Sequence, residues 1–172
     1  MVGPEVSLDG ERVGLRPLLP ADIHRLVEIV SEPGVREWWW GYNEDRMREE
    51  TFGDEDVTPF AIELDGELIG LIMYTEELDP YYKFAMIDVT VDAGHVGQGL
   101  GTDALRTLAR YLIDARGHHH IMIDPAADNA RAIAAYKKVG FKPVGVMRRY
   151  ERGPDGLWRD ALLMDLLAEE LT

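Results

Sequence analysis

The sequence predicts an α+β fold in which one central, mostly antiparallel sheet is flanked by helices. Segments with the two-residue period of a strand outnumber helical segments, and several follow one another through short turns. The Asp65-Gly66 dipeptide joins two of them as expected of a tight hairpin. Elsewhere a strand, a helix and a strand follow in that order, which predicts one parallel pair within the mixed sheet.

The first third of the chain predicts one strand and two helices. Alternating apolar positions from Val6 to Leu19 indicate an opening strand. A helix is expected from about Ala21 to Ser31, with Asp22 near its start and Pro33-Gly34 ending it. A second, short and charged helix is expected from Asn43 to Glu50.

The middle of the chain predicts three consecutive strands. Thr58 to Leu64 and Glu67 to Tyr74 form two apolar strands, and Asp65-Gly66 between them suits a type I′ turn. The apolar run from Phe84 to Val91 is expected to be the central strand. The helix that begins near Thr102 has one apolar face, which can pack on the sheet and comprises Leu105, Leu108, Ala109 and Leu112.

The last third predicts a strand, a helix and a closing hairpin. The strand is expected from His118 to Ile123, and the helix from Asn129 to Val139, with Gly140 as its left-handed stop. The hairpin is expected from segments 142–152 and 157–167 around a Pro-Asp-Gly turn.

Length and composition predict a single domain spanning residues 1–172. A chain of 172 residues with 46% apolar residues can bury a substantial core. The absence of cysteine excludes disulfides and cysteine catalysis. The sequence has neither a signal-like N-terminus nor an apolar stretch of about eighteen residues, so a soluble, cytoplasmic protein without a membrane partner is expected.

The charge balance is strongly acidic, with 32 acidic and 18 basic residues and a formal net charge of −14. Nucleic acid is therefore not an expected partner, because its phosphates would be repelled over the whole surface. The acidity has two interpretations. It can serve solubility alone, or it can concentrate a cationic substrate.

The run Val96-Gly97-Gln98-Gly99-Leu100-Gly101-Thr102 lies between the predicted central strand and a helix. Glycines at alternate positions let backbone N–H groups converge on an anion, and the helix N-terminus adds attraction. The run lacks the Gly-Lys pair of nucleotide-hydrolase phosphate loops, and its third glycine is misplaced for the dinucleotide-binding fingerprint. It predicts a cradle for another phosphate-bearing ligand.

Two motifs in this chain resemble those of the GCN5-related N-acetyltransferases. Gly99 and Gly101 match the Arg/Gln-x-x-Gly-x-Gly/Ala loop that binds the acetyl-CoA pyrophosphate, although Val96 occupies its first position. The segment Asp128 to Phe141 fills every position of Asn-x-x-Ala-x-x-x-Tyr-x-x-x-Gly-Phe. The resemblance implies acetyl-CoA as co-substrate and no metal, and it extends over nearly the whole chain because the predicted element order is also that of this fold.

The resemblance assigns roles to residues of both motifs and of the central strand. Tyr136 would protonate the departing CoA thiolate, and Asn129, two turns earlier on the helix, would contact the pantetheine arm. A bulge would splay the central strand, so that the backbone of Val89 and Val91 could bind the acetyl carbonyl and pantetheine. The cradle itself would comprise Val96, Gly97, Gln98, Gly99, Leu100, Gly101 and Thr102.

Asp88 is a carboxylate within the apolar central strand. One interpretation places it on a solvated face, beside Met86 and Thr90 by alternation. The other gives it a catalytic role, in which it meets the substrate ammonium and accepts its proton directly or through water.

Further segments resemble the aminoglycoside 6′-N-acetyltransferases. These are Val35 to Gly41, which contains Glu-Trp-Trp, Val57 to Phe60, Ile87-Asp88 and Ile123-Asp124-Pro125. The resemblance implies that Trp39, with Trp38 beside it, walls the acceptor site. Asp88 and Asp124 would grip its amines. Adjacent tryptophans in an extended chain face opposite ways, so not all three are expected in one pocket, and at least one is expected in the core.

Three other features have less specific interpretations. The acidic segment Glu76 to Pro80 is either a solvated loop or a source of further substrate carboxylates. Adjacent side chains in the His118-His119-His120 triplet would diverge in a strand, so no metal site is expected there. His95 precedes the glycine run and contacts either the cofactor or solvent.

The expected activity is direct acetyl transfer, in a ternary complex, to a primary amine of an aminoglycoside-like polycation. Two alternatives stay open. The first is a related enzyme that acetylates a protein N-terminus, a lysine or a small metabolic amine such as a siderophore precursor. The second is a non-catalytic acyl-CoA-binding module. The sequence is compatible with a monomer or a homodimer.

Overall fold

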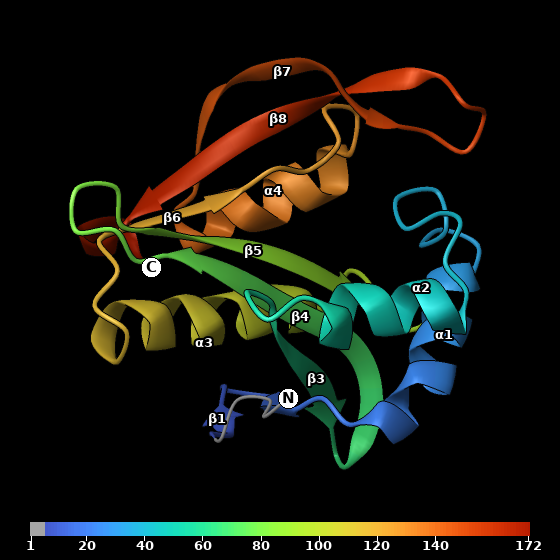
Figure 1. The fold of residues 1–172 in the computed structure, drawn as a ribbon. Coiled ribbons are helices and arrows are strands. Elements are labelled where there is room, and N and C mark those ends of the chain that lie inside the picture. Colours follow the sequence, from blue (N-terminus) through green and yellow to red (C-terminus); the bar gives the residue numbers. More distant parts are fainter. Residues whose placement is uncertain (1–5) are drawn as a thin grey trace.

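The computed structural model describes residues 6–172, which contain one sheet with the strand order β1-β2-β3-β4-β5-β6-β8-β7. In Figure 1, α3 and α4 cover one face of this sheet, and α1 and α2 cover part of the other. The strands are β1 (Leu8–Asp9), β2 (Gly14–Pro17), β3 (Thr58–Leu64), β4 (Glu67–Glu77), β5 (Phe84–Val91), β6 (His120–Ile123), β7 (Lys142–Arg152) and β8 (Trp158–Leu167). The helices are α1 (Ile23–Ser31), α2 (Glu44–Arg48), α3 (Leu100–Asp114) and α4 (Ala130–Val139).

Only β5 and β6 pair in parallel among the named strands of residues 6–172. This pair confirms the prediction from the strand, helix, strand order. It is short, because the register joins Ala85 to Ile121 and Met86 to Met122 and then ends. Beyond these residues the two strands diverge, which leaves the second half of β5 without a strand on that side.

The bulge expected in the central strand is absent from the β4–β5 ladder. Its register runs without a shift from Gly70 opposite Val91 to Glu77 opposite Phe84. The opening beside Val89 therefore comes from the divergence of β6, and the expectation of a bulge in β5 was wrong.

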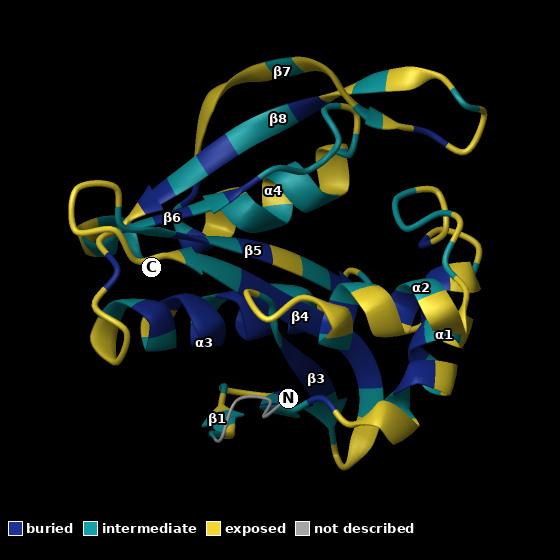
Figure 2. Ribbon diagram, viewed as in Figure 1, coloured by how far each residue is buried: buried dark blue, intermediate teal, exposed yellow. Residues whose placement is uncertain are grey.

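The apolar core has two parts, one on each face of the sheet. The larger part contains the apolar face of α3 that the sequence predicts, with Leu105, Leu108, Ala109 and Leu112 all fully buried. The smaller part joins α1 and α2 to β3 and β4. Figure 2 shows α3, β3 and β4 as largely buried, whereas β7 at the sheet edge is mostly exposed. Full burial of one leucine contributes about 1.5–3 kcal/mol to stability.

The predicted Asp65-Gly66 hairpin is confirmed. Both residues have positive φ angles, 51° and 82°, as a type I′ turn requires. The first predicted strand, from Val6 to Leu19, is wrong, because this segment forms two short strands, β1 and β2, joined by a turn.

A buried carboxylate on α3 explains the turn between β1 and β2. The Asp103 side chain accepts the backbone N–H groups of Glu11, Arg12 and Val13 at 3.1, 2.8 and 3.0 Å. A Cβ atom at Gly10 would lie 2.7 Å from the same carboxylate, so the close approach requires glycine. This interaction joins positions about ninety residues apart in the sequence, and the local pattern of residues 6–19 gives no sign of it.

None of the helices within residues 6–172 combines the length and apolar character needed to cross a bilayer.

We expect Asp103→Ala to lower the free energy of unfolding by about 2–4 kcal/mol, because it leaves three amide donors without their charged acceptor. Urea unfolding followed by circular dichroism measures this change. Asp114→Ala is the matched control, since Asp114 is exposed on the same helix, and its removal should change stability by less than about 0.5 kcal/mol. Equal effects of the two substitutions would contradict a structural role for Asp103.

Candidate functional site

A cavity of about 790 Å³ opens where β5 and β6 diverge. Its walls come from β5, the glycine run, α4, the loop between α1 and α2, and the end of β7. Most site residues predicted from the sequence line it, namely Trp38, Trp39, Asp88, Val89, Val91, Val96, Gly97, Gly99, Gly101, Thr102, Asp124, Asn129 and Tyr136. Gln98 and Leu100 do not. Leu100 is fully buried in the core, and the Gln98 amide donates to the Gly94 carbonyl at 2.9 Å.

The glycine run forms a cradle of backbone amides at the start of α3. Gly97 and Gly99 adopt φ angles of 80° and 79°, and Gly99 is the residue that caps the helix. Among the described residues, the backbone amides from Val96 to Gly99 donate no hydrogen bond to the chain. Free amides at the N-terminus of a 15-residue helix attract anions, so this arrangement can bind a phosphate group.

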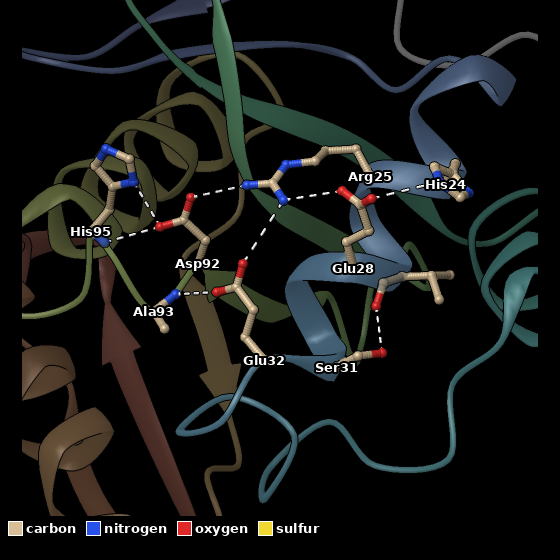
Figure 3. A network of polar contacts seen from close by, with 9 residues as sticks. His24, Arg25, Glu28, Ser31, Glu32, Asp92, Ala93 and His95 are labelled. Atoms are coloured by element: carbon tan, nitrogen blue, oxygen red, sulfur yellow. Dashed lines mark hydrogen bonds and ion pairs between the residues drawn. The ribbon is translucent and has the colours of Figure 1, made fainter.

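Carboxylates hold the segment that leads into this cradle in place (Figure 3). Asp92, which is only 5% exposed, accepts the His95 backbone N–H at 2.9 Å and lies 2.6 Å from the His95 ring Nδ1. Arg25 of α1 donates to the same carboxylate at 3.4 Å, and Glu32 accepts the Ala93 N–H at 2.7 Å. His95 thus lines the cavity while Asp92 holds the Nδ1 side of its ring.

Helix α4 supplies the opposite wall, as its motif predicts. The Asn129 side-chain oxygen caps the helix by accepting the Ala132 N–H at 3.2 Å. Gly140 ends it with a φ of 115°. Tyr136 faces the cavity, and its ring packs against Phe141. Burial raises the pKa of the Tyr136 hydroxyl, and two nearby carboxylates raise it further, so Tyr136 carries its proton at neutral pH.

Asp88 lies on the cavity wall at the point where β5 leaves β6. Its side chain is open to the cavity, but the surrounding walls desolvate the carboxylate, and the charges of Asp124, Glu50 and Glu151 repel its own. Together these effects raise the pKa of Asp88 to about 7. A carboxylate with this pKa can bind or release a proton near neutral pH, which favours the catalytic interpretation over a solvated surface position.

Two further carboxylates of this cluster are also shifted towards the protonated form. Desolvation raises the pKa of Asp124, although a hydrogen bond from the Tyr150 hydroxyl opposes the shift. Desolvation likewise raises the pKa of Glu151, with a contribution from the Asp124 charge. Several negative charges therefore lie close together in the cavity, and an ammonium group bound among them would reduce their mutual repulsion.

All three tryptophans line the cavity, which corrects the expectation that adjacent tryptophans cannot do so. Residues 34–41 form turns, and the alternation of an extended strand does not apply to them. Each indole is half-buried, and Trp39 also packs against the core and lies 5.5 Å from the Tyr42 ring. The Arg46 guanidinium stacks over Tyr42 at 4.1 Å, donates to Glu50 and donates to the Trp40 carbonyl.

Several cavity residues escaped the sequence analysis. Trp40 was not predicted to line the site, because adjacent tryptophans were expected to face opposite ways in an extended chain. Tyr42 directly precedes a predicted helix and Glu50 ends it, and Tyr150 and Glu151 belong to a predicted hairpin, but no local signal ties them to the site. A search for polar and aromatic residues at the ends of predicted elements would have included them among many others.

Two features singled out in the sequence lie outside the cavity. Glu76 belongs to β4 and pairs with Arg116 at 2.8 Å and with the buried His118 at 2.6 Å, so it contributes no acceptor carboxylate. His120 pairs separately with Asp165 at 3.0 Å. Within residues 6–172, no three histidine or acidic side chains are grouped as a metal ion would require.

Residues 23–141 match the model of the acetyltransferase (GNAT) family. The aminoglycoside N(6′)-acetyltransferase type 1 of Klebsiella pneumoniae is 28% identical over 170 residues, which cover 88% of this chain and 82% of that protein. RimJ of Mycobacterium smegmatis in complex with CoA-disulfide has a TM-score of 0.84 at 26% identity, covering 96% of this chain and 89% of that one. AAC(6′)-Ib in complex with paromomycin and acetyl-CoA has a TM-score of 0.75 at 28% identity, covering 93% and 96%.

We expect Asp88 to titrate near pH 7 in a carbon-13 NMR titration of the aspartate carboxyl groups, because desolvation and like charges disfavour its ionised form. Asp124→Asn should lower this pKa, since it removes the largest of the three repulsions and keeps a side chain of the same size in the cavity wall. An Asp88 midpoint near the ordinary value of about 4 would contradict this description of the site.

Proposed function

This chain belongs to the acetyltransferase (GNAT) family, and we propose that the amine it acetylates is carried by an aminoglycoside-like polycation. The chain is an acetyl-CoA-dependent N-acetyltransferase. The proposal concerns the acceptor and the roles of individual residues.

The observation that carries the proposal is the composition of one end of the cavity. Four carboxylates and three indoles line the same cavity, and the charges of neighbouring carboxylates raise the pKa values of Asp88 and Glu151. Carboxylates bind ammonium groups, and flat aromatic faces attract cations and pack on apolar sugar rings. Arg46 already pairs with Glu50, whereas Asp88, Asp124 and Glu151 have no ion-pair partner among the described residues, so a substrate with one amine would leave two of these three charges unpaired. The carboxylates and indoles are Glu50, Asp88, Asp124, Glu151, Trp38, Trp39 and Trp40.

The other end of the cavity fits acetyl-CoA. The free amides from Val96 to Gly99 suit its pyrophosphate, and the second half of β5, unpaired on the β6 side, suits its pantetheine arm. Arg131 and Lys138 on α4 also line the cavity and add positive charge. When bound, acetyl-CoA supplies the acetyl group as a thioester.

The proton transfers of the reaction fall to two residues on opposite walls. Asp88 accepts the proton that the acceptor ammonium loses, directly or through water. The neutral amine nitrogen then forms a bond to the acetyl carbon, the carbon–sulfur bond breaks, and Tyr136 donates its proton to the departing thiolate. The nitrogen loses its second proton as the amide forms, and this proton restores the Tyr136 hydroxyl through water. The raised pKa of Asp88 suits a base, and the raised pKa of Tyr136 keeps the acid protonated until this step.

The same carboxylates that bind the acceptor also oppose its deprotonation. Negative charges around an ammonium group raise its pKa, whereas the reaction requires the neutral amine. Asp88 offsets part of this effect, because its own pKa of about 7 makes it a stronger base than an ordinary aspartate. The remaining carboxylates then serve as anchors for amines that do not react.

The acceptor is tested by measuring thiol release from acetyl-CoA with kanamycin-type aminoglycosides, spermidine and a peptide with a free N-terminus. We expect kcat/KM for at least one aminoglycoside to exceed that for spermidine and the peptide by about 10²-fold, because several ammonium groups and a sugar face are bound together. Asp124→Asn should raise the aminoglycoside KM about tenfold while leaving the acetyl-CoA KM unchanged. Faster turnover of the peptide or polyamine would overturn the choice of acceptor.

Variants of the two proton-transferring residues should separate their roles. In the native enzyme kcat/KM should rise with pH through about 7, because Asp88 can accept a proton only when ionised. Asp88→Asn should remove this rise and lower kcat/KM about 10²-fold at pH 8. Tyr136→Phe should lower kcat about 10²-fold and keep the rise near pH 7.

Acetyl-CoA binding by both variants, measured by calorimetry, serves as the control for folding. Unchanged turnover in Tyr136→Phe would instead support a different acid or the non-catalytic acyl-CoA-binding alternative.

A further inference from the structure

The hairpin of β7 and β8 contains an irregularity next to the cavity. Between two paired positions, β7 advances from Met147 to Glu151 while β8 retreats only from Ala161 to Arg159. The surplus residues of β7 bulge out, and within them Arg149 adopts a φ of 52°. A positive φ is unfavourable for arginine, so surrounding interactions must hold it there.

Asp160 of β8 supplies the interaction that holds the bulge. Its carboxylate accepts the Arg149 backbone N–H at 2.8 Å. Its backbone carbonyl accepts the Ala127 N–H at 2.9 Å, and the next residue, Ala161, forms an isolated bridge with Ala126. Asp160 therefore connects the β7 bulge to the segment that follows Asp124.

The part of β7 that lines the cavity begins within the bulge. Tyr150 inside the bulge and Glu151 and Arg152 directly after it line the cavity, whereas the regular part of β7 before the bulge does not. Tyr150 lies within the bulge, and its hydroxyl is near enough to the Asp124 carboxylate to lower the pKa of Asp124. Bulges are known to redirect side chains next to functional sites.

A purely structural interpretation would assign the bulge to the exposed edge of the sheet, where such irregularities discourage pairing with other chains. That role needs no particular contact on the cavity side. Here Tyr150 within the bulge lines the cavity and influences the Asp124 carboxylate. The residue that holds the bulge also binds, through its main chain, the segment after that carboxylate.

We propose that Asp160 is a positioning residue for the acceptor, which acts by holding the Arg149 bulge and thereby sets Tyr150 against Asp124. The proposal rests on the proposed function in so far as the acceptor occupies the acidic end of the cavity. It predicts no role in acetyl-CoA binding, because the amide cradle and the Tyr136 wall belong to other elements.

The test compares Asp160→Ala with two variants that preserve the bulge. Asp160→Ala should raise the acceptor KM roughly fivefold and leave the acetyl-CoA KM unchanged. Asp160→Asn should remain close to the native enzyme, because the amide oxygen can still accept the Arg149 N–H. Adding Arg149→Gly to Asp160→Ala should restore much of the acceptor KM, because glycine adopts a positive φ without strain.

A second measurement does not depend on any acceptor. The nearby Tyr150 hydroxyl lowers the Asp124 pKa, so Asp160→Ala should raise that pKa in an NMR titration, as should Tyr150→Phe. The Arg149→Gly addition should reverse the rise caused by Asp160→Ala. Asp155→Ala is the matched control, because Asp155 accepts a backbone N–H in the turn of the same hairpin, outside the cavity.

The two measurements separate the possible failures. An unchanged Asp124 pKa in Asp160→Ala would overturn the proposal, as would an equal rise in both KM values with a lowered Tm, which indicates a structural role. If the native enzyme turned over no aminoglycoside, the proposed function would fail, and the Asp124 titration would still decide the role of Asp160.

Discussion

The parting of β5 and β6 after two residue pairs is the constraint on which the site depends. It leaves half of the central strand unpaired on one side, within a sheet that is otherwise regular around it. A continued ladder would close the cavity, and the amide cradle and α4 would no longer face a common space. Asp88 lies at this parting, which explains how a carboxylate can occupy an apolar strand while remaining open to a ligand.

The lining of the resulting cavity divides its charges between elements. The glycine run and the N-terminus of α3 contribute free backbone amides and α4 contributes cations, whereas Asp88, Asp124 and Glu151 contribute carboxylates from other segments. Such a division suits one anionic and one cationic substrate whose reactive groups meet between them. The charges of Asp88 and Asp124 raise the pKa of Tyr136, so the proposed acid and base are electrostatically coupled.

Carboxylates distant from the chemistry keep this arrangement in place. Asp103 holds the turn between β1 and β2, and Asp92 fixes the first residues of the cradle against α1. Asp160 holds the β7 bulge and, through its backbone carbonyl, the segment that follows β6. In each case a carboxylate accepts backbone N–H groups of an irregular segment that lacks a strand or helix partner, which satisfies donors that would otherwise be costly to leave unpaired.

The sequence by itself determined the elements and the cofactor motifs, because strand and helix periods, the Asp65-Gly66 turn and the Asn129 to Gly140 helix depend on neighbours in the chain. The parallel pair and the membership of Asp88, Asp124 and Tyr136 in one site also followed, through element order and resemblance. Only the tertiary structure decided that residues 6–19 form two strands, that all three tryptophans reach the cavity, and that Tyr150 and Glu151 join it. These outcomes depend on contacts between different segments, such as those made by the Asp103 carboxylate and those in the β7 bulge. The local spacing of apolar residues does not predict such contacts.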